Sequence, residues 1–183
     1  MPEQRVSYRY AKAIFDSVLQ EKLEERVYND FMVVLQILKY APELLSIARK
    51  PLISPVRKKK LYQEIFAEKV SPQTLNFILF LVDKDRDYLL KDIILQYQKL
   101  YFAYKNFLPV EIYLPKDFDE GLKGKIVSKL EENTGKKIIP KFIIDSKILG
   151  GFRIKIDDWV YDATLRNKLD SLYKDLVLTI KVN

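Results

Sequence analysis

Residues 71–82 read SPQTLNFILFLV, and this stretch decides how the first half of the chain must be organised. Ser71 followed by Pro72 is a helix start signal, because serine is a preferred N-cap residue and proline is favoured at the first helical position. The helix that follows carries two apolar stripes: Leu75, Ile78, Leu79 and Val82 in one, and Phe77, Phe80 and Leu81 in the other. A peripheral helix of a small bundle needs only one stripe. The pattern therefore predicts either a central helix or a helix whose second face receives a partner, and it leaves both open.

Further helical segments surround this stretch. Helical spacing of apolar residues predicts helices over 7–20, 23–40 and 88–104, a short helix opened by Pro42, and a helix that starts at Ser54 and Pro55. The first of these has an apolar face widened by Val6, Tyr10 and Ala13. If the first and fifth helices pack side by side, they leave an apolar groove between them, and such grooves accept an amphipathic helix from another chain.

Glycine marks the boundary between two parts of the chain. All five glycines follow residue 120: Gly121, Gly124, Gly135, Gly150 and Gly151. The glycine-free part has helical spacing throughout, whereas the rest alternates strand and helix patterns. The sequence therefore predicts an α+β fold, with a six-helix bundle over 1–105 followed by a small mixed α/β domain over 106–183.

The second domain is expected to hold three strands, a short returning strand and two helices. Strand patterns cover 109–114, 138–145 and 152–156, and residues 159–161 form the candidate return. Asp117 with Glu120 resembles a capping box for the helix between the first two strands, and Thr134-Gly135 ends that helix. The last helix has leucines at spacings of 4, 3 and 4: Leu165, Leu169, Leu172 and Leu176. We expect this seam to lie mostly in the domain core, although a partner helix could share it.

Composition argues against an enzyme. The 183 residues include neither cysteine nor histidine, which excludes thiolate catalysis, histidine bases and histidine- or cysteine-ligated metals. Asp157, Asp158 and Asp162 lack the spacing of a calcium loop and are interpreted as a polar turn. We therefore expect no catalytic residue, no metal and no cofactor.

Charge is mildly positive and spread out. The chain has 32 Lys and Arg against 25 Asp and Glu, a net charge of +7, with both signs interspersed. The basic run over residues 57–60 is interpreted as a solvated helix face rather than a phosphate or lipid contact. The longest strictly apolar run, residues 77–82, is far too short to span a bilayer, and the N-terminus has no signal peptide pattern. We expect a soluble protein whose only membrane link is through a partner.

Three segments carry a family resemblance: RYAKAIF at residues 9–15, IIDSKILGGFRIKIDD at 143–158 and VYDATLRNKL at 160–169. Together with Asn76, Phe77 and Arg86, they resemble the delta subunit of F-type ATP synthases, which is called the oligomycin-sensitivity-conferring protein in mitochondria. Lys168 stands where the family commonly has arginine. The resemblance extends over nearly the whole chain and agrees with the predicted order of helices and strands.

The resemblance implies a non-catalytic stator subunit that clamps the catalytic alpha/beta hexamer to the peripheral stalk while the rotor turns. Its helical domain would bind the N-terminal helices of alpha subunits through its first and fifth helices, and its second domain would engage the C-terminal helices of the b subunit. The complex would lie at the cytoplasmic face of the bacterial cell membrane. A basic nucleic-acid-binding protein is the main alternative, and a small enzyme that uses lysine or carboxylates is another.

Two residue sets carry these expectations. The candidates for binding the alpha helix are Tyr10, Ala13, Ile14, Phe77, Phe80 and Leu81. The residues that either face the stalk or fix the fold are Gly150, Gly151, Phe152, Asp162, Leu165 and Arg166.

Overall fold

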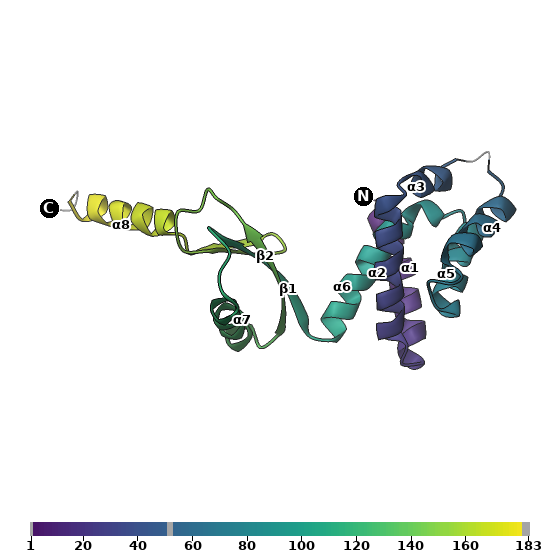
Figure 1. Cartoon of the computed structure of the whole chain (residues 1–183), viewed down its shortest axis with the longest axis horizontal. Helices are drawn as coiled ribbons and strands as arrows, with labels where there is room; N and C mark the ends of the chain where they lie inside the picture. The colour runs from purple at the N-terminus through teal and green to yellow at the C-terminus, as the bar shows by residue number, and fades with distance from the viewer. Residues whose placement is uncertain (1, 51–52, 181–183) are drawn as a thin grey trace. The chain divides into compact units, whose positions relative to one another are not determined.

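The computed structural model describes residues 2–50 and 53–180, which form two compact units (Figure 1). Unit 1 comprises Met1–Lys105 and unit 2 comprises Asn106–Asn183. Unit 1 is helical, and unit 2 combines a four-stranded sheet with two helices. The α+β class and the order of a helical region before an α/β region are therefore confirmed.

The helices of unit 1 follow the predicted spacing closely. They are α1 (Pro2–Gln20), α2 (Glu24–Tyr40), α3 (Glu43–Ala48), α4 (Pro55–Phe66), α5 (Pro72–Asp83) and α6 (Leu90–Tyr104), with a short 3-10 helix η1 (Asp87–Leu89) before the last. Helix α1 packs against α6 and α2, and α4 packs against α5. Phe31, Phe66, Ile78, Ile93 and Tyr97 are fully buried at the centre. The predicted six-helix bundle did not include η1.

Two serine–proline pairs begin helices as predicted, but their hydroxyl groups do not cap them. Ser54 and Ser71 are the N-cap residues of α4 and α5, in extended backbone conformation, and proline follows each. Neither side chain makes a capping hydrogen bond to the backbone of its own helix. Proline contributes by fixing the first helical φ and by lacking an amide that would need a partner.

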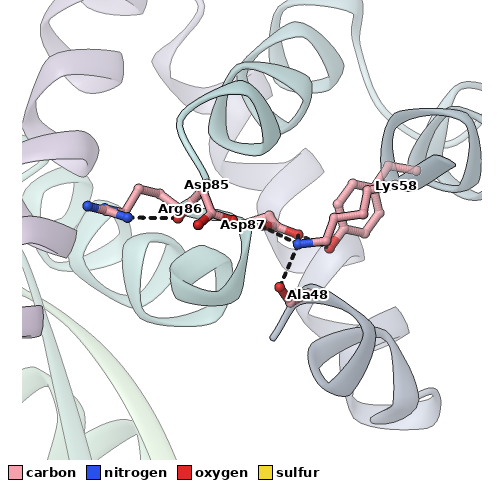
Figure 2. Close-up of polar contacts among 6 residues, drawn as sticks. Ala48, Lys58, Asp85, Arg86 and Asp87 are labelled. Carbon is pink, nitrogen blue, oxygen red and sulfur yellow. Dashed lines mark hydrogen bonds and ion pairs between the residues drawn. The ribbon is translucent and has the colours of Figure 1, made fainter. Parts of the chain in front are cut away.

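A buried ion pair joins α3, α4 and η1 (Figure 2). The Lys58 ammonium donates to the Ala48 carbonyl at 2.6 Å and lies 3.2 Å from an Asp87 carboxylate oxygen. The Lys58 and Asp87 side chains are only 5% and 0% exposed. The predicted solvated face at residues 57–60 is therefore wrong at Lys58, because four consecutive helical residues point in four directions and one of them meets the core.

Tyr62 completes this cluster. Its hydroxyl donates to the Asp87 carboxylate at 3.2 Å. Burial, reinforced by the Asp87 charge, raises the pKa of the Tyr62 hydroxyl well above its usual value. The hydroxyl therefore stays protonated at neutral pH and remains a donor to Asp87.

Unit 2 is built on a sheet in the order β2-β1-β3-β4. Its strands are β1 (Phe107–Leu114), β2 (Lys137–Ile144), β3 (Arg153–Ile156) and β4 (Trp159–Asp162). Helix α7 (Glu120–Thr134) connects the parallel pair β1 and β2, whereas β3 runs antiparallel to both β1 and β4. Ile126, Val127 and Leu130 of α7 pack on a core that contains Ile112 and Ile154.

The ends of α7 show one wrong and one correct sequence prediction. The cap is Asp119, whose carboxylate accepts from the Leu122 amide at 2.8 Å, so the capping box expected at Asp117 and Glu120 is misplaced. Gly135 ends the helix as predicted, with a left-handed φ of 64°. The last helix, α8 (Leu165–Ile180), follows β4.

We predict that Lys58→Met destabilises unit 1 by about 3–5 kcal/mol, because it leaves the Asp87 carboxylate buried without its cation. The free energy of unfolding is measured by urea titration of the full chain, with far-ultraviolet circular dichroism as the signal.

The matched control is Lys59→Met, one residue along α4. Lys59 pairs with Asp83 at 2.6 Å, but the two side chains are 34% and 52% exposed. Exposed pairs of this kind contribute less than about 1 kcal/mol. Equal losses in the two variants would show that the buried pair does not hold unit 1 together.

Candidate functional site

Exposed and half-buried apolar residues lie where the Tyr10 ring of α1 approaches the Phe80 ring of α5. We call this the α1–α5 surface and define it by Tyr10, Ala13, Phe77 and Phe80. Phe80 is 44% exposed, Ala13 is exposed, and Tyr10 and Phe77 are half-buried. The Tyr10 and Phe80 rings lie 6.3 Å apart between centroids, which joins the two helices. The structure brings the Tyr10 and Phe80 side chains together, while the groove and the binding of a partner there stay predictions.

Two of the six expected contact residues face the core instead. Leu81 is 0% exposed and Ile14 is 7% exposed, so in this structure neither can touch a partner. The buried side of α5 consists of Thr74, Ile78, Leu81 and Val82. Leu81 belongs to this side because it lies three residues after Ile78 and seven after Thr74, spacings that keep residues on one helix face. The assignment of Leu81 to the phenylalanine stripe was wrong.

Positive charge borders the α1–α5 surface. The Lys84 ammonium lies 5.5 Å from the centroid of the Phe80 ring, within range of a cation–π interaction. On α1, Lys12 pairs with Asp16 at 2.6 Å. A partner helix with apolar residues on one side and a carboxylate near the end of α5 would match this arrangement.

In unit 2, residues 150–152, which include Gly150 and Gly151, hydrogen-bond to the junction segment from which α8 begins. The Gly150 carbonyl accepts a hydrogen bond from the Leu165 amide at 3.0 Å, and the Phe152 carbonyl accepts one from the Ala163 amide at 3.0 Å. Gly151 has φ of 80°, and a Cβ there would lie 2.3 Å from the Ala163 carbonyl oxygen. Only glycine fits that position without strain.

Asp162 serves the same junction. Its carboxylate accepts from the Thr164 amide at 3.0 Å and from the Arg153 guanidinium at 3.2 Å, and its carbonyl accepts from the Asn167 side chain. Hydrogen bonds from Thr164, with a smaller contribution from Arg153, lower the pKa of Asp162. Asp162 therefore stays ionised at neutral pH and fixes the turn into α8.

The last helix is exposed along its apolar seam. Leu165, Leu169, Leu172 and Tyr173 are 53%, 66%, 59% and 70% exposed. The expectation that the seam lies mostly in the domain core is wrong for these described side chains, and the Leu176 side chain lies outside the described ones. Arg166 is exposed as well. Figure 1 shows α8 continuing past the sheet of unit 2 rather than lying on it.

A cleft of about 820 Å³ opens beside α7 in unit 2. Its apolar lining includes Leu122, Ile126, Phe152, Ile154, Ile156, Trp159 and Tyr161. Tyr161 and Trp159 of β4 lie directly opposite Ile154 and Ile156 of β3 in the strand register. Their side chains are therefore on the same sheet face as Ile154, the face on which α7 packs. Lys125, Lys129 and Lys168 also line the cleft. The exposed Trp159 and Tyr161 show that the core face of the sheet continues beyond the part that α7 covers.

Sequence reasoning missed the role of Trp159 and Tyr161. They are 70% and 53% exposed, and both line the cleft. The available signal was their spacing of two within the short returning strand, which places both aromatic side chains on one face. The strand was predicted, but a sequence pattern does not show whether a helix covers that face.

Comparisons with known proteins agree on one family. The family model described as ATP synthase delta (OSCP) subunit matches residues 6–176. The ATP synthase subunit delta of Fusobacterium nucleatum is 33% identical over 174 residues, covering 95% of this chain and 99% of the relative. Its counterpart in Clostridium perfringens strain 13 is 32% identical over 164 residues, which cover 90% of this chain and 92% of that relative. The subunit delta of Propionigenium modestum, described as sodium ion specific, is 31% identical over 172 residues, which cover 94% of this chain and 98% of that relative.

The fold also matches a solved structure. A chain in the cryo-EM structure of the Toxoplasma gondii mitochondrial ATP synthase hexamer aligns with a TM-score of 0.69 and 20% identity. The alignment covers 93% of this chain and 97% of that chain. This likeness shows a shared fold.

We predict that Gly151→Ala destabilises unit 2 by at least about 2 kcal/mol, because alanine at a left-handed φ is strained and its Cβ would meet backbone. The measurement is urea unfolding followed by the fluorescence of Trp159, the single tryptophan of the chain.

Gly124→Ala is the control, because Gly124 lies within α7 and nothing lies within 4 Å of an added Cβ. Alanine there should stabilise the helix by about 0.5–1 kcal/mol. An unchanged midpoint for Gly151→Ala would contradict the role assigned to the junction.

Proposed function

The chain belongs to the ATP synthase delta (OSCP) subunit family, and we propose how its two units perform the work of a stator subunit in the rotary F-type ATP synthase. Unit 1 binds the N-terminal helices of the alpha subunits, and unit 2 engages the C-terminal helices of the b subunit. The chain holds the catalytic hexamer to the peripheral stalk so that rotation of the central rotor is coupled to ATP synthesis. It contributes no catalytic residue of its own.

The exposed Phe80 ring beside Tyr10 carries the proposal for unit 1. Phe80 is 44% exposed, while Ile78 and Leu81 on the buried side of the same helix hold α5 in the bundle, so the exposed ring can serve as an apolar anchor. Anchors of this kind dominate interface energetics when a partner removes them from water. An amphipathic helix would lay its apolar side on the α1–α5 surface and place a carboxylate near Lys84.

Two uncovered apolar features of unit 2 support the stalk assignment. One is the α8 seam, and the other is the cleft beside α7. Helices of the b subunit would cover the seam in the manner of a coiled coil, since the leucine spacing matches that geometry. The three lysines that line the cleft favour acidic residues on the partner.

A stator joint needs slow dissociation rather than chemistry. The proposed contacts would dissociate slowly, because dissociation must re-expose the apolar area that they bury. Differences in affinity between related interfaces lie mainly in the dissociation rate. The described residues include no helix long and apolar enough to cross a bilayer. We place the chain at the cytoplasmic face of the bacterial cell membrane, attached through the rest of the complex. None of the comparisons supports the nucleic-acid-binding alternative.

For unit 1, we predict that Phe80→Asp weakens binding of a peptide with the sequence of the N-terminal helix of the alpha subunit by more than about 2 kcal/mol. The substitution removes the anchor and places a charge against the apolar side of the peptide. Isothermal titration calorimetry with the full chain measures the affinity.

Tyr8→Asp provides the matched control. Tyr8 is an aromatic residue on α1 with 47% exposure, close to that of Phe80, but it lies two residues from Tyr10 and so on another helix face. Its substitution should leave peptide affinity within a factor of about two. Unchanged affinity in a folded Phe80→Asp variant would reject the α1–α5 surface as the binding site.

For unit 2, we predict that Leu169→Asp weakens binding of a fragment from the C-terminal end of the b subunit by at least about tenfold, while Ser171→Asp on another side of α8 does not. Pull-down titration of the fragment with each folded variant makes the comparison. Equal binding by wild type and Leu169→Asp would remove the seam from the stalk interface.

A further inference from the structure

The N-terminus of α5 is capped by a residue from a different helix. One carboxylate oxygen of Asp30, in α2, accepts hydrogen bonds from the Ser71 amide at 2.8 Å and from the Thr74 hydroxyl at 2.8 Å. The Ser71 hydroxyl donates to the same oxygen. Ser71 and Thr74 are 2% and 0% exposed. A half-buried carboxylate therefore gathers three donors at the start of α5.

This contact replaces the local cap that the sequence predicted. The Ser71 side chain does not cap the backbone of α5, and its hydroxyl donates to Asp30 instead. Hydrogen bonds to an ionised acceptor are stronger than neutral ones, and a negative charge at a helix N-terminus is favourable. Because 41 residues separate Asp30 from Ser71, the contact fixes α5 to α2 rather than merely ending a helix.

The same part of α2 also contacts the outer face of α5. Phe31 follows Asp30 directly, and its ring lies 6.1 Å from the ring of Phe77, one turn beyond Thr74. One turn further, the Phe80 ring meets Tyr10 of α1 at 6.3 Å. The polar contact at the first turn and the ring contact at the second both hold α5 against α2, and α2 in turn packs against α1.

We propose that Asp30 is a positioning residue for the partner-binding surface: by anchoring the first turn of α5, it sets where Phe77 and Phe80 lie relative to Tyr10. This inference rests on the proposed function of unit 1. Asp30 acts through α5 and touches no partner itself.

The test uses the full chain and the N-terminal peptide of the alpha subunit in calorimetric titrations. Asp30→Ala removes the acceptor of all three hydrogen bonds and should weaken binding by at least about tenfold. Asp30→Asn, which keeps an oxygen acceptor for the Ser71 amide, should recover part of that loss. Asp119→Ala is the control, because it removes an aspartate cap from α7 in unit 2 and should leave affinity unchanged.

A double-mutant cycle with Phe80→Ala separates positioning from general destabilisation. If Asp30 acts by placing Phe80, Asp30→Ala should cost much less affinity once Phe80 is absent, because residues that act together are not additive. Additive losses in the cycle would overturn the positioning role. Thr74→Val removes one donor with little change in shape, and it should weaken binding about threefold even if Asp30→Ala fails to fold.

Failure of the positioning role of Asp30 can be told apart from failure of peptide binding by unit 1. A wild-type chain that does not bind the peptide contradicts the proposed function of unit 1. A wild-type chain that binds, with folded Asp30→Ala and Thr74→Val variants that bind equally well, overturns the positioning role and leaves the proposed function intact.

Discussion

Helix α5 carries apolar side chains on two sides, and unit 1 fully buries only one of them. One side of the helix, with Ile78 and Leu81, is closed inside the bundle. The other side carries Phe77, which is half-buried, and Phe80, which stays exposed beside Tyr10. Contiguous exposed apolar surface is a feature of binding sites. We propose that the exposed side of α5 is the physical basis for attachment to a partner in the stator role.

Unit 2 shows the same principle in a sheet. The face that packs on α7 continues onto β4, where Trp159 and Tyr161 remain exposed. In the following helix, Leu165, Leu169 and Leu172 are exposed to water. Gly151 and Asp162 lie in the junction before α8, where their contacts are internal, whereas the apolar seam that starts at Leu165 is exposed.

Periodicity predicted the elements well because each depends on residues a few positions apart. It did not place Leu81, since Phe80 and Leu81 are neighbours about 100° apart on the helix and either stripe can include the boundary residue. Lys58 was missed because its burial depends on Asp87, 29 residues away. The leucine seam of α8 was misplaced because its spacing is the same whether the partner lies inside the domain or on another chain.

The most direct test is to map by nuclear magnetic resonance where the N-terminal peptide of the alpha subunit binds on the isotope-labelled full chain. We expect the largest chemical-shift changes, and intermolecular nuclear Overhauser effects from peptide protons, at the side chains of Tyr10, Ala13, Phe77 and Phe80. Resonances of the α8 seam should stay unchanged. Peptide contacts confined to unit 2, or to the opposite side of unit 1, would contradict the claim that the exposed side of α5 attaches this chain to its partner.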